Sequence, residues 1–297
     1  MKRGLFGRGA EGSGWGRSSL RLAAVLLIAF VLSGCRGERV VRLSDNTDVD
    51  PAEIAGELAG VRIVFVGEHH DDKRHHAKQL TLIKALHDAG YRVAVGLEMF
   101  RAEDQEALDR WVAGEMEKDE FVDAYYGYWT IPFSQYADIF DYARDEAIPL
   151  VGLNIPKEII HQVFEGGFES LSPDQLAEMP GVSCDIDPEY EAFIKKAMGR
   201  HEASDPSYFK SFCEAQMVWD TSMAHRIIEY LKANPDRVLV VLAGSVHSWK
   251  RGIPSQVSRR SDFKYVVILP ESPDELSFEE ITFEDADYLW LLPSWGG

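Results

Sequence analysis

Three kinds of feature are scarce in this sequence: cysteines, long apolar runs and positive charges. Only three cysteines occur in 297 residues, and their spacing is not that of a zinc finger. The longest apolar run, at residues 22–32, is too short to cross a bilayer comfortably. Lysine and arginine total 31 against 49 aspartates and glutamates, so the net charge is −18. This acidity argues against binding to nucleic acid or to anionic membrane surfaces.

The N-terminal residues have the pattern of a secretory signal rather than of a folded segment. Residues 1–21 contain five basic residues and one acid, and the apolar run follows directly. The run ends in "LSGC", which resembles the lipobox of bacterial lipoproteins. That resemblance implies a signal peptide at residues 1–34 and lipid, palmitate included, on the sulfur of Cys35. An ordinary cleaved signal and an anchor helix are the alternatives.

Cleavage before Cys35 would change the net charge of the chain and so the way in which it can attach to a membrane. It removes five positive charges and one negative charge, so the net charge changes from −18 to −22. We therefore expect the lipid, and not a basic patch, to hold the protein in the bacterial cell envelope. Arg36 rather than aspartate follows the cysteine, which indicates the outer membrane, facing the periplasm.

The mature chain is long enough for one domain with a full core. We interpret residues 35–55 as a lipid-tethered linker and residues 56–297 as a single α/β domain. Two cysteines remain in that domain, Cys184 and Cys213. In an oxidising compartment they could form a disulfide, but two buried free thiols would fit the sequence equally well.

Five nearly continuous apolar segments predict buried strands. Their lack of alternation is typical of strands that are covered on both faces. They lie at residues 61–67, 91–100, 148–154, 237–244 and 264–270. Helical patterns separate them, at residues 72–89, 103–114, 134–146 and 206–233. This alternation predicts a mainly parallel sheet with flanking helices, and residues 156–205 are expected to form a helical lobe over the carboxyl ends of the strands.

Polar residues lie at the carboxyl end of each predicted strand. Glu68 and His70 follow the first strand, Glu98 lies near the end of the second, Asn154 ends the third, and His247 follows the fourth. The carboxyl ends of parallel strands lie along one edge, where open α/β folds bind ligands. The sequence therefore predicts a cluster of Glu68, His70, Glu98 and His247.

The helix at residues 72–89 brings further imidazoles to this edge. His75, His76 and Gln79 lie in its first two turns. A helix N-terminus disfavours an imidazolium, so these rings are expected to be biased toward the neutral form that binds metal. His69 is expected to point away from the site.

Two other segments are candidates for supporting roles. Gln216 and Asp220 lie four residues apart on the helix at 206–233, so they could contact each other or reach the cluster. Met217 and Met223 are expected to fill the core. The aromatic stretch "YYGYWTIPF" could line a pocket for a flat ligand or could pack in the core; it contains Tyr125, Tyr126, Tyr128, Trp129 and Phe133.

Taken together, these motifs resemble the ChaN-like family of haem-binding lipoproteins. The stretch "GEHHDDKRHHAKQ" is similar to its GExHxxxxHHxxQ signature. Further matches are "LEMF", "YADIFDYARDEAIPLVGLN" with Tyr136 and Asn154, "EAQMVWDTSMA", and "LAGSVHSWKRGIP". They run in order over most of residues 60–255. The C-terminal stretch "FEDADYLWLLPSWGG" has no match in this pattern.

The resemblance implies haem binding and a role in haem or iron uptake. It also implies haem held in a homodimer, with an outer-membrane haem receptor as a partner. Tyr126 or Tyr128 is the expected axial ligand, because a phenolate suits ferric iron, and His70 is a further candidate. The sequence has no Cys-x-x-Cys-His motif, so c-type covalent attachment is excluded.

A second function remains open, because the resemblance extends to a superfamily with erythromycin-esterase-like hydrolases and Tiki metalloproteases. In that case Glu68, His70, Glu98 and His247 would bind zinc, manganese or iron. One carboxylate would be the general base of an esterase or peptidase. This alternative explains why paired carboxylates accompany the histidines.

Overall fold

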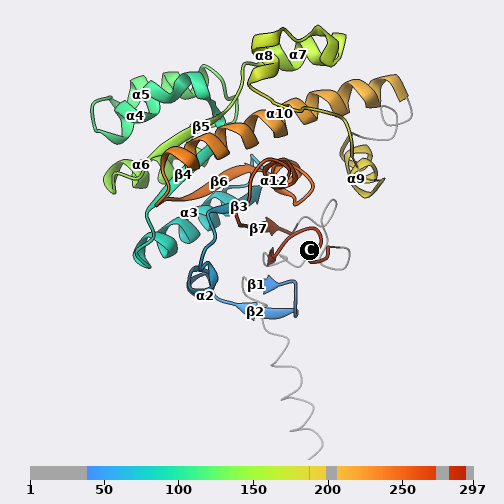
Figure 1. Ribbon diagram of the computed structural model, residues 1–297. Coiled ribbons are helices and arrows are strands. Elements are labelled where there is room, and N and C mark those ends of the chain that lie inside the picture. The colour runs from blue at the N-terminus through green and yellow to red at the C-terminus, as the bar shows by residue number, and fades with distance from the viewer. Residues whose placement is uncertain (1–38, 187, 199–205, 272–280, 292–297) are drawn as a thin grey trace, which may run out of the picture. The chain divides into compact units, whose positions relative to one another are not determined.

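An eight-stranded sheet forms the centre of the fold (Figure 1). The computed structural model describes residues 39–186, 188–198, 206–271 and 281–291. The strand order is β2-β1-β8-β7-β3-β6-β4-β5, and the pairs from β8 to β5 are all parallel. The strands are β1 (Arg39–Arg42), β2 (Thr47–Val49), β3 (Ile63–Glu68), β4 (Val93–Arg101), β5 (Leu150–Asn154), β6 (Val238–Gly244), β7 (Tyr265–Pro270) and β8 (Tyr288–Leu291). The predicted mainly parallel sheet is confirmed.

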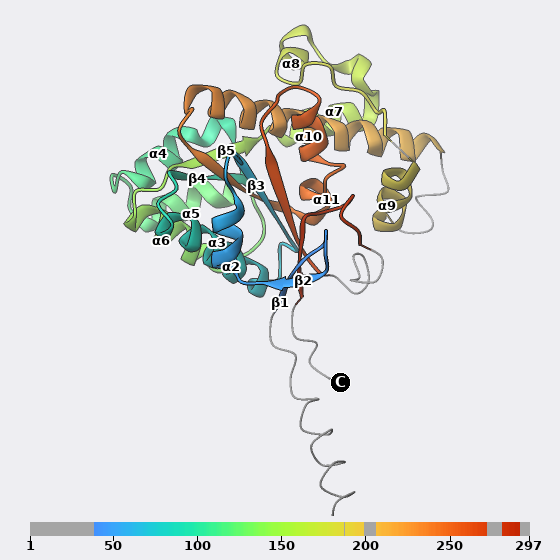
Figure 2. The ribbon, with the colours of Figure 1, turned by 60° about the horizontal axis from the view of Figure 1, so that its bottom comes forward.

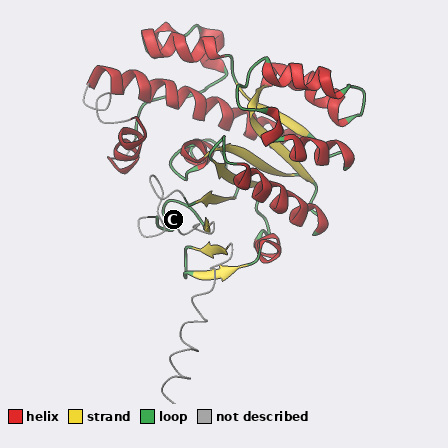
Figure 3. Cartoon of the chain, turned by 180° about the vertical axis from the view of Figure 1, so that it is seen from behind, coloured by secondary structure: helices red, strands yellow, loops and turns green. Residues whose placement is uncertain are grey.

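Helices lie on both sides of the strands (Figure 3). The longer ones are α3 (Lys73–Asp88), α4 (Gln105–Val112), α5 (Lys118–Tyr126), α6 (Ala137–Asp145), α7 (Lys157–Gly166), α9 (Pro188–Met198) and α10 (Pro206–Ala233). The shorter ones are α2 (Pro51–Glu57), α8 (Pro173–Ala177), α11 (Ser245–Ser248), α12 (Ile253–Ser258), and the 3-10 turns η1 (Ala102–Asp104), η2 (Phe133–Gln135) and η3 (Phe168–Ser170).

The central strands are apolar throughout because both of their faces are buried. In β3, Val64 and Val66 pack with the core on the side of α3, α4 and α6. Ile63 and Phe65 point to the opposite face and pack with α10 and α12. This alternation is the two-residue period of a strand, and each face buries its own apolar cluster.

Residues 39–49, expected to be a linker, instead belong to the sheet. β1 and β2 form a hairpin at one edge (Figure 2), and Val41 of β1 is fully buried. β1 also pairs with β8, which lies in the C-terminal stretch that had no match in the family pattern. The domain therefore begins earlier than residue 56, because its first strand covers the edge that β8 would otherwise expose.

The described part of residues 156–205 contains α7, η3, α8 and α9. Residues of α7 and of the segments on either side of α8 pack with α10 through a separate apolar cluster that includes Val163, Met179 and Val218. Cys184 of this lobe and Cys213 of α10 form a disulfide with a Cα–Cα distance of 5.9 Å. The choice between a disulfide and free thiols is therefore decided in favour of the disulfide.

The predicted signal peptide and Cys35 lie outside the described residues. Within the described ranges, no helix combines the length and the apolar character that crossing a bilayer requires.

Candidate functional site

The carboxyl ends of β3, β4 and β6 bring their polar residues together. Glu68 ends β3 and is paired in register with Gly244, which ends β6. Glu98 lies where the pairing of β4 with β5 becomes irregular after Leu97. Its Oε2 accepts a hydrogen bond of 2.7 Å from the Gly244 amide. Asn154 at the end of β5 donates to the Glu98 carbonyl at 2.9 Å.

Glu68 is the centre of a buried hydrogen-bond network. Its Oε1 accepts from His70 Nδ1 at 2.7 Å and from the Tyr136 hydroxyl. Its Oε2 accepts from Gln79 Nε2 at 2.6 Å, and His76 Nδ1 lies 3.3 Å away. The Glu68 side chain is fully buried, so these donors compensate a charge that would otherwise be costly to bury.

These contacts decide the charge states around Glu68. Burial alone would raise the pKa of Glu68, but hydrogen bonds from His70 and His76 hold it well below its usual range. Burial alone would lower the pKa of His76, yet the bond to Glu68 raises it. The neutral form expected from the helix N-terminus is therefore opposed at His76 by a carboxylate in direct contact.

His70 connects Glu68 to Glu98. Its Nδ1 contacts Glu68, and its Nε2 lies 3.9 Å from Glu98 Oε1. Burial works against its charge, but Glu98 and then Glu68 raise the pKa of His70 to about 9. A methyl group at Gly244 would come within 3.2 Å of this ring, so the missing side chain there permits the close approach.

His247 lies near the same oxygen of Glu98 as His70 does. Its Nε2 is 3.6 Å from Glu98 Oε1, and its Nδ1 donates to Asp220 Oδ1 at 2.6 Å. The Gln216 amide lies 3.0 Å from the same Nδ1. Burial opposes the charge of His247, but Glu98 and Asp220 together raise its pKa. Glu98 Oε1 thus has two imidazoles near it, and the structure brings the four cluster residues together.

The supporting residues divide between two groups. Tyr136, His76 and Gln79 surround Glu68, whereas Gln216 and Asp220 surround His247. Asn154 fixes the backbone of Glu98. Each predicted supporting residue except His75 therefore contacts a member of the cluster.

His69 and His75 pair with one another beside the cluster. The His69 amide donates to His75 Nδ1 at 2.9 Å, and the two rings are 5.4 Å apart. Burial lowers the pKa of His75 to about 4, so this ring is neutral as expected. The neutral state comes mainly from desolvation, which costs more for the charged ring.

The geometry of the described residues does not support the metal site of the alternative, hydrolase interpretation. Both Glu68 oxygens accept hydrogen bonds from buried protein groups, which leaves Glu68 behind His70 rather than in the open. In the described ranges, no group of three or more histidine, cysteine or acidic side chains is arranged to hold a metal ion.

The aromatic stretch is divided between core and site. Tyr125 is fully buried and its hydroxyl donates to the Ile131 carbonyl. Tyr128 is 6% exposed and donates to the Ile155 carbonyl at 3.0 Å. Tyr126, by contrast, is 49% exposed. Trp129 packs edge-on against His70 with ring centroids 5.0 Å apart, so this stretch forms one wall beside the cluster.

Two contacts of the cluster were not predicted from the sequence. Trp129 was considered only as a member of the aromatic stretch, although its ring lies against His70. Tyr190 donates to Asp220 Oδ2 at 3.0 Å from α9. The density of aromatic residues could have indicated Trp129. No sequence pattern marks Tyr190, because a disulfided lobe brings it to α10.

Comparison with known proteins gives the same family as these residues. A family model described as "Haem-binding uptake, Tiki superfamily, ChaN" matches residues 54–257. No curated protein matches the chain. The structure of cofacial haem binding to ChaN of Campylobacter jejuni is similar, with a TM-score of 0.69 and 19% identity. The similarity covers 86% of this chain and 96% of that chain.

A hydrolase structure shares the fold more distantly. A mutant of the erythromycin esterase EreC in its open conformation has a TM-score of 0.51 and 14% identity, over 87% of this chain and 98% of that chain. At such identities the two solved structures show the fold alone. The family model, however, covers more than half of the chain. The chain therefore belongs to the ChaN family of haem-binding uptake proteins in the Tiki superfamily.

Proposed function

We propose that this protein binds haem on the wall formed by its aromatic stretch beside His70, as a lipid-anchored protein of haem or iron uptake. Family membership supports haem as the ligand. The location of the proposed haem site rests on Trp129. Its indole nitrogen is buried and has no hydrogen-bond partner among the described residues, while its ring contacts His70.

The residues of this wall fit the chemistry of haem. Trp129 offers aromatic surface, and the buried ring of Tyr128 lies roughly parallel to it, with an interplanar angle of 17°. Two cations adjoin them: Lys157 Nζ lies 4.6 Å and Arg101 Cζ 5.6 Å from the centre of the Tyr128 ring. Lys157 could pair with a propionate, as could the free indole N–H, whereas Arg101 is already paired with Asp104. The acidic cluster does not oppose the binding of the propionates, because buried imidazoles compensate the negative charges of Glu68 and Glu98.

Among the tyrosines, Tyr126 is the one we assign to the iron. Tyr125 and Tyr128 are buried and use their hydroxyl protons on backbone carbonyls. Burial raises the pKa of both phenols above the usual value, which disfavours the phenolate that ferric iron prefers. The Tyr126 oxygen instead accepts a hydrogen bond of 2.9 Å from the Phe133 amide. When bound, haem would supply the iron, and the protein supplies the phenolate.

The assignment predicts a specific loss on replacing Tyr126. Tyr126→Phe should weaken hemin binding roughly tenfold or more, because it removes one strong contact to the iron. A tenfold loss of affinity corresponds to about 1.4 kcal/mol of binding free energy. It should also remove the phenolate-to-iron absorption band. Tyr128→Phe should leave that band in place.

Hemin titration followed by the Soret band measures both effects. Tyr265→Phe is the matched control, because Tyr265 begins β7 and so lies at the opposite end of the sheet. If Tyr126→Phe binds hemin like the control and keeps the band, the iron ligand is elsewhere, with His70→Ala as the next variant.

We propose the anchor on separate grounds, those of the lipobox at Cys35. Cys35→Ser should abolish lipidation and release the protein from the membrane fraction, since the lipid on Cys35 is the proposed anchor. Membrane fractionation and mass spectrometry test this. An unchanged mass and an unchanged membrane fraction would mean that another feature anchors the chain.

Two partners follow as proposals from the family. Tyr126 is exposed, so haem bound there could be covered by a second copy of this chain in a homodimer. An outer-membrane haem receptor would supply or accept the haem.

The metal-dependent hydrolase is not favoured by any specific observation, because both Glu68 oxygens are occupied by protein donors.

A further inference from the structure

One part of the helical lobe crosses α10 and α12 next to the cluster. We call residues 178–186 with the first turn of α9, residues 188–190, the strap segment. Three of its carbonyls are held by arginines: Arg260 donates to Pro180 at 2.9 Å and to Gly181 at 3.1 Å, and Arg259 donates to Asp185 at 3.2 Å. Ion pairs join Glu178 to Arg226 and Glu189 to Arg251.

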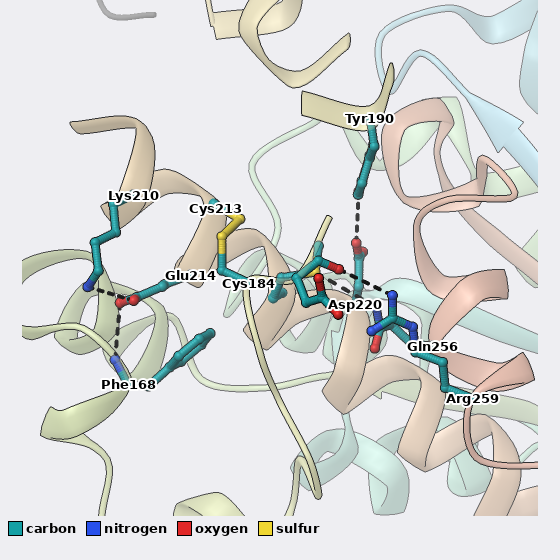
Figure 4. Close-up of a disulfide and its surroundings, with 11 residues drawn as sticks. Phe168, Cys184, Tyr190, Lys210, Cys213, Glu214, Asp220, Gln256 and Arg259 are labelled. Carbon is teal, nitrogen blue, oxygen red and sulfur yellow. Dashed lines mark hydrogen bonds and ion pairs between the residues drawn. A yellow bond between two sulfur atoms is a disulfide. The ribbon is translucent and has the colours of Figure 1, made fainter. Parts of the chain in front are cut away.

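A disulfide attaches the strap segment covalently to α10 (Figure 4). Cys213 is fully buried in α10, whereas Cys184 in the strap segment is only partly buried. Cys213 and Asp220 are seven residues apart on this helix, which is about two turns, so they lie on the same face. The disulfide therefore holds the strap segment against the face of α10 that carries Asp220.

Tyr190 is the residue through which the strap segment reaches the site. It is 1% exposed, and its ring packs edge-on against Trp249 with centroids 5.7 Å apart. Its hydroxyl donates to Asp220 Oδ2 at 3.0 Å (Figure 4). A buried phenol in a single orientation thus supplies a donor to a carboxylate that is itself fully buried.

Asp220 passes this constraint to the cluster. One of its oxygens accepts from Tyr190 and the other accepts from His247 Nδ1 at 2.6 Å. Because donors hold the carboxylate from two sides, its plane is fixed, and so is the ring of His247. The opposite ring nitrogen, Nε2, then faces Glu98 Oε1 at 3.6 Å.

We propose that Tyr190 is a positioning residue for His247, acting through Asp220, and that the Cys184–Cys213 disulfide keeps it in place. The strap segment would then control the orientation of one of the two imidazoles that flank Glu98. This inference concerns the protein without haem, so it does not rest on the proposed function.

The disulfide also makes this positioning sensitive to reduction. A dithiol reductant transfers two electrons and two protons: the Cys184–Cys213 bond breaks, both sulfurs become thiols, and the reductant closes to a cyclic disulfide. Attack is directed to the Cys184 sulfur, since Cys213 is buried. Noncovalent contacts alone would then hold Tyr190 on Asp220.

Nuclear magnetic resonance of the full-length, haem-free protein with labelled histidine tests the proposal. The readout is the exchange rate with water of the His247 Nδ1 proton, which is assigned by its absence in His247→Gln. In the oxidised wild type this proton should exchange slowly, because it is buried in a hydrogen bond. In Tyr190→Phe, in Cys184→Ala and in reduced wild type it should exchange about tenfold faster or more.

Arg226→Ala is the matched control, because it removes a strap contact at Glu178, far along the segment from Tyr190. Its His247 proton should exchange as in the wild type. Equal exchange rates in all these proteins would overturn the proposal, even if Cys184→Ala unfolds more easily. A rapidly exchanging His247 proton in the oxidised wild type would also overturn it. If Cys184→Ala does not fold, Tyr190→Phe decides, since it keeps the buried ring and loses only the hydroxyl.

Discussion

Replacing Glu68 by alanine should destabilise the fold by about 3–5 kcal/mol, the range for removing one partner of a buried ion pair. Glu68 is the shared acceptor of His70, His76, Gln79 and Tyr136. Without it these groups lose their acceptor inside the protein, and two imidazoles lose the carboxylate that supports their charge. Denaturant unfolding at constant pH measures the loss.

The pH dependence of the free energy of unfolding provides a second test of this prediction. The pKa of His70 is raised from 6.5 to about 9, so its ion pairs stabilise the fold fully below pH 6.5 and are lost as pH rises through 9. The pKa of Glu68 is lowered from 4.5, so its contribution is present above that value and lost in acid. The stability advantage of wild type over Glu68→Gln should therefore be largest between these limits and decrease toward pH 9.

Glu214→Ala is a matched control for Glu68→Ala. Glu214 is also buried, but its partners are the Phe168 amide and Lys210, whose side chain is 71% exposed and can return to water. The control should cost only about 1 kcal/mol, the value of an ordinary hydrogen bond. If both variants lose the same stability, Glu68 is not the centre of a compensated charge network.

Removing the disulfide should cost about 3–4 kcal/mol in the free energy of unfolding. Cys184 and Cys213 are 29 residues apart, and closing a loop of that length restricts the unfolded chain by about this amount. The double variant Cys184→Ala with Cys213→Ala should therefore melt roughly 6–16 °C lower than the oxidised wild type. Calorimetry measures the difference.

Two comparisons separate the disulfide from other effects of that double variant. Wild type reduced with dithiothreitol should lose a similar free energy. Arg226→Ala, which removes only an exposed ion pair of the strap segment, should lose about 1 kcal/mol or less. A double variant as stable as the wild type would show that the loop is already restricted in the unfolded chain.

The central strands could be predicted because their apolar runs are long and carry their own signal. β3, β4, β5, β6 and β7 all lie within one to two residues of the predicted segments. β1, β2 and β8 were missed because they have four residues or fewer and gain their stability from pairing across the chain. No local pattern reports that Val41 will be covered by β8.

The cluster could be predicted for a related reason. Glu68, Glu98 and His247 each lie at or just beyond the carboxyl end of an identifiable strand, so parallel topology alone places them at one edge. The prediction failed to separate Tyr126 from Tyr128, because their burial depends on how α5 and the turn after it pack. It also placed Glu68 among metal ligands, since sequence does not show that Gln79 and Tyr136 occupy its oxygens.

Haem binding is the central property proposed for this protein. Equilibrium titration of the full-length wild type with hemin, followed by the Soret band, tests it most directly. The wild type should give a shifted Soret band that grows to a sharp stoichiometric end point, together with the phenolate-to-iron band of Tyr126. A weak rise in absorbance without an end point, identical in wild type and Tyr126→Phe, would contradict it.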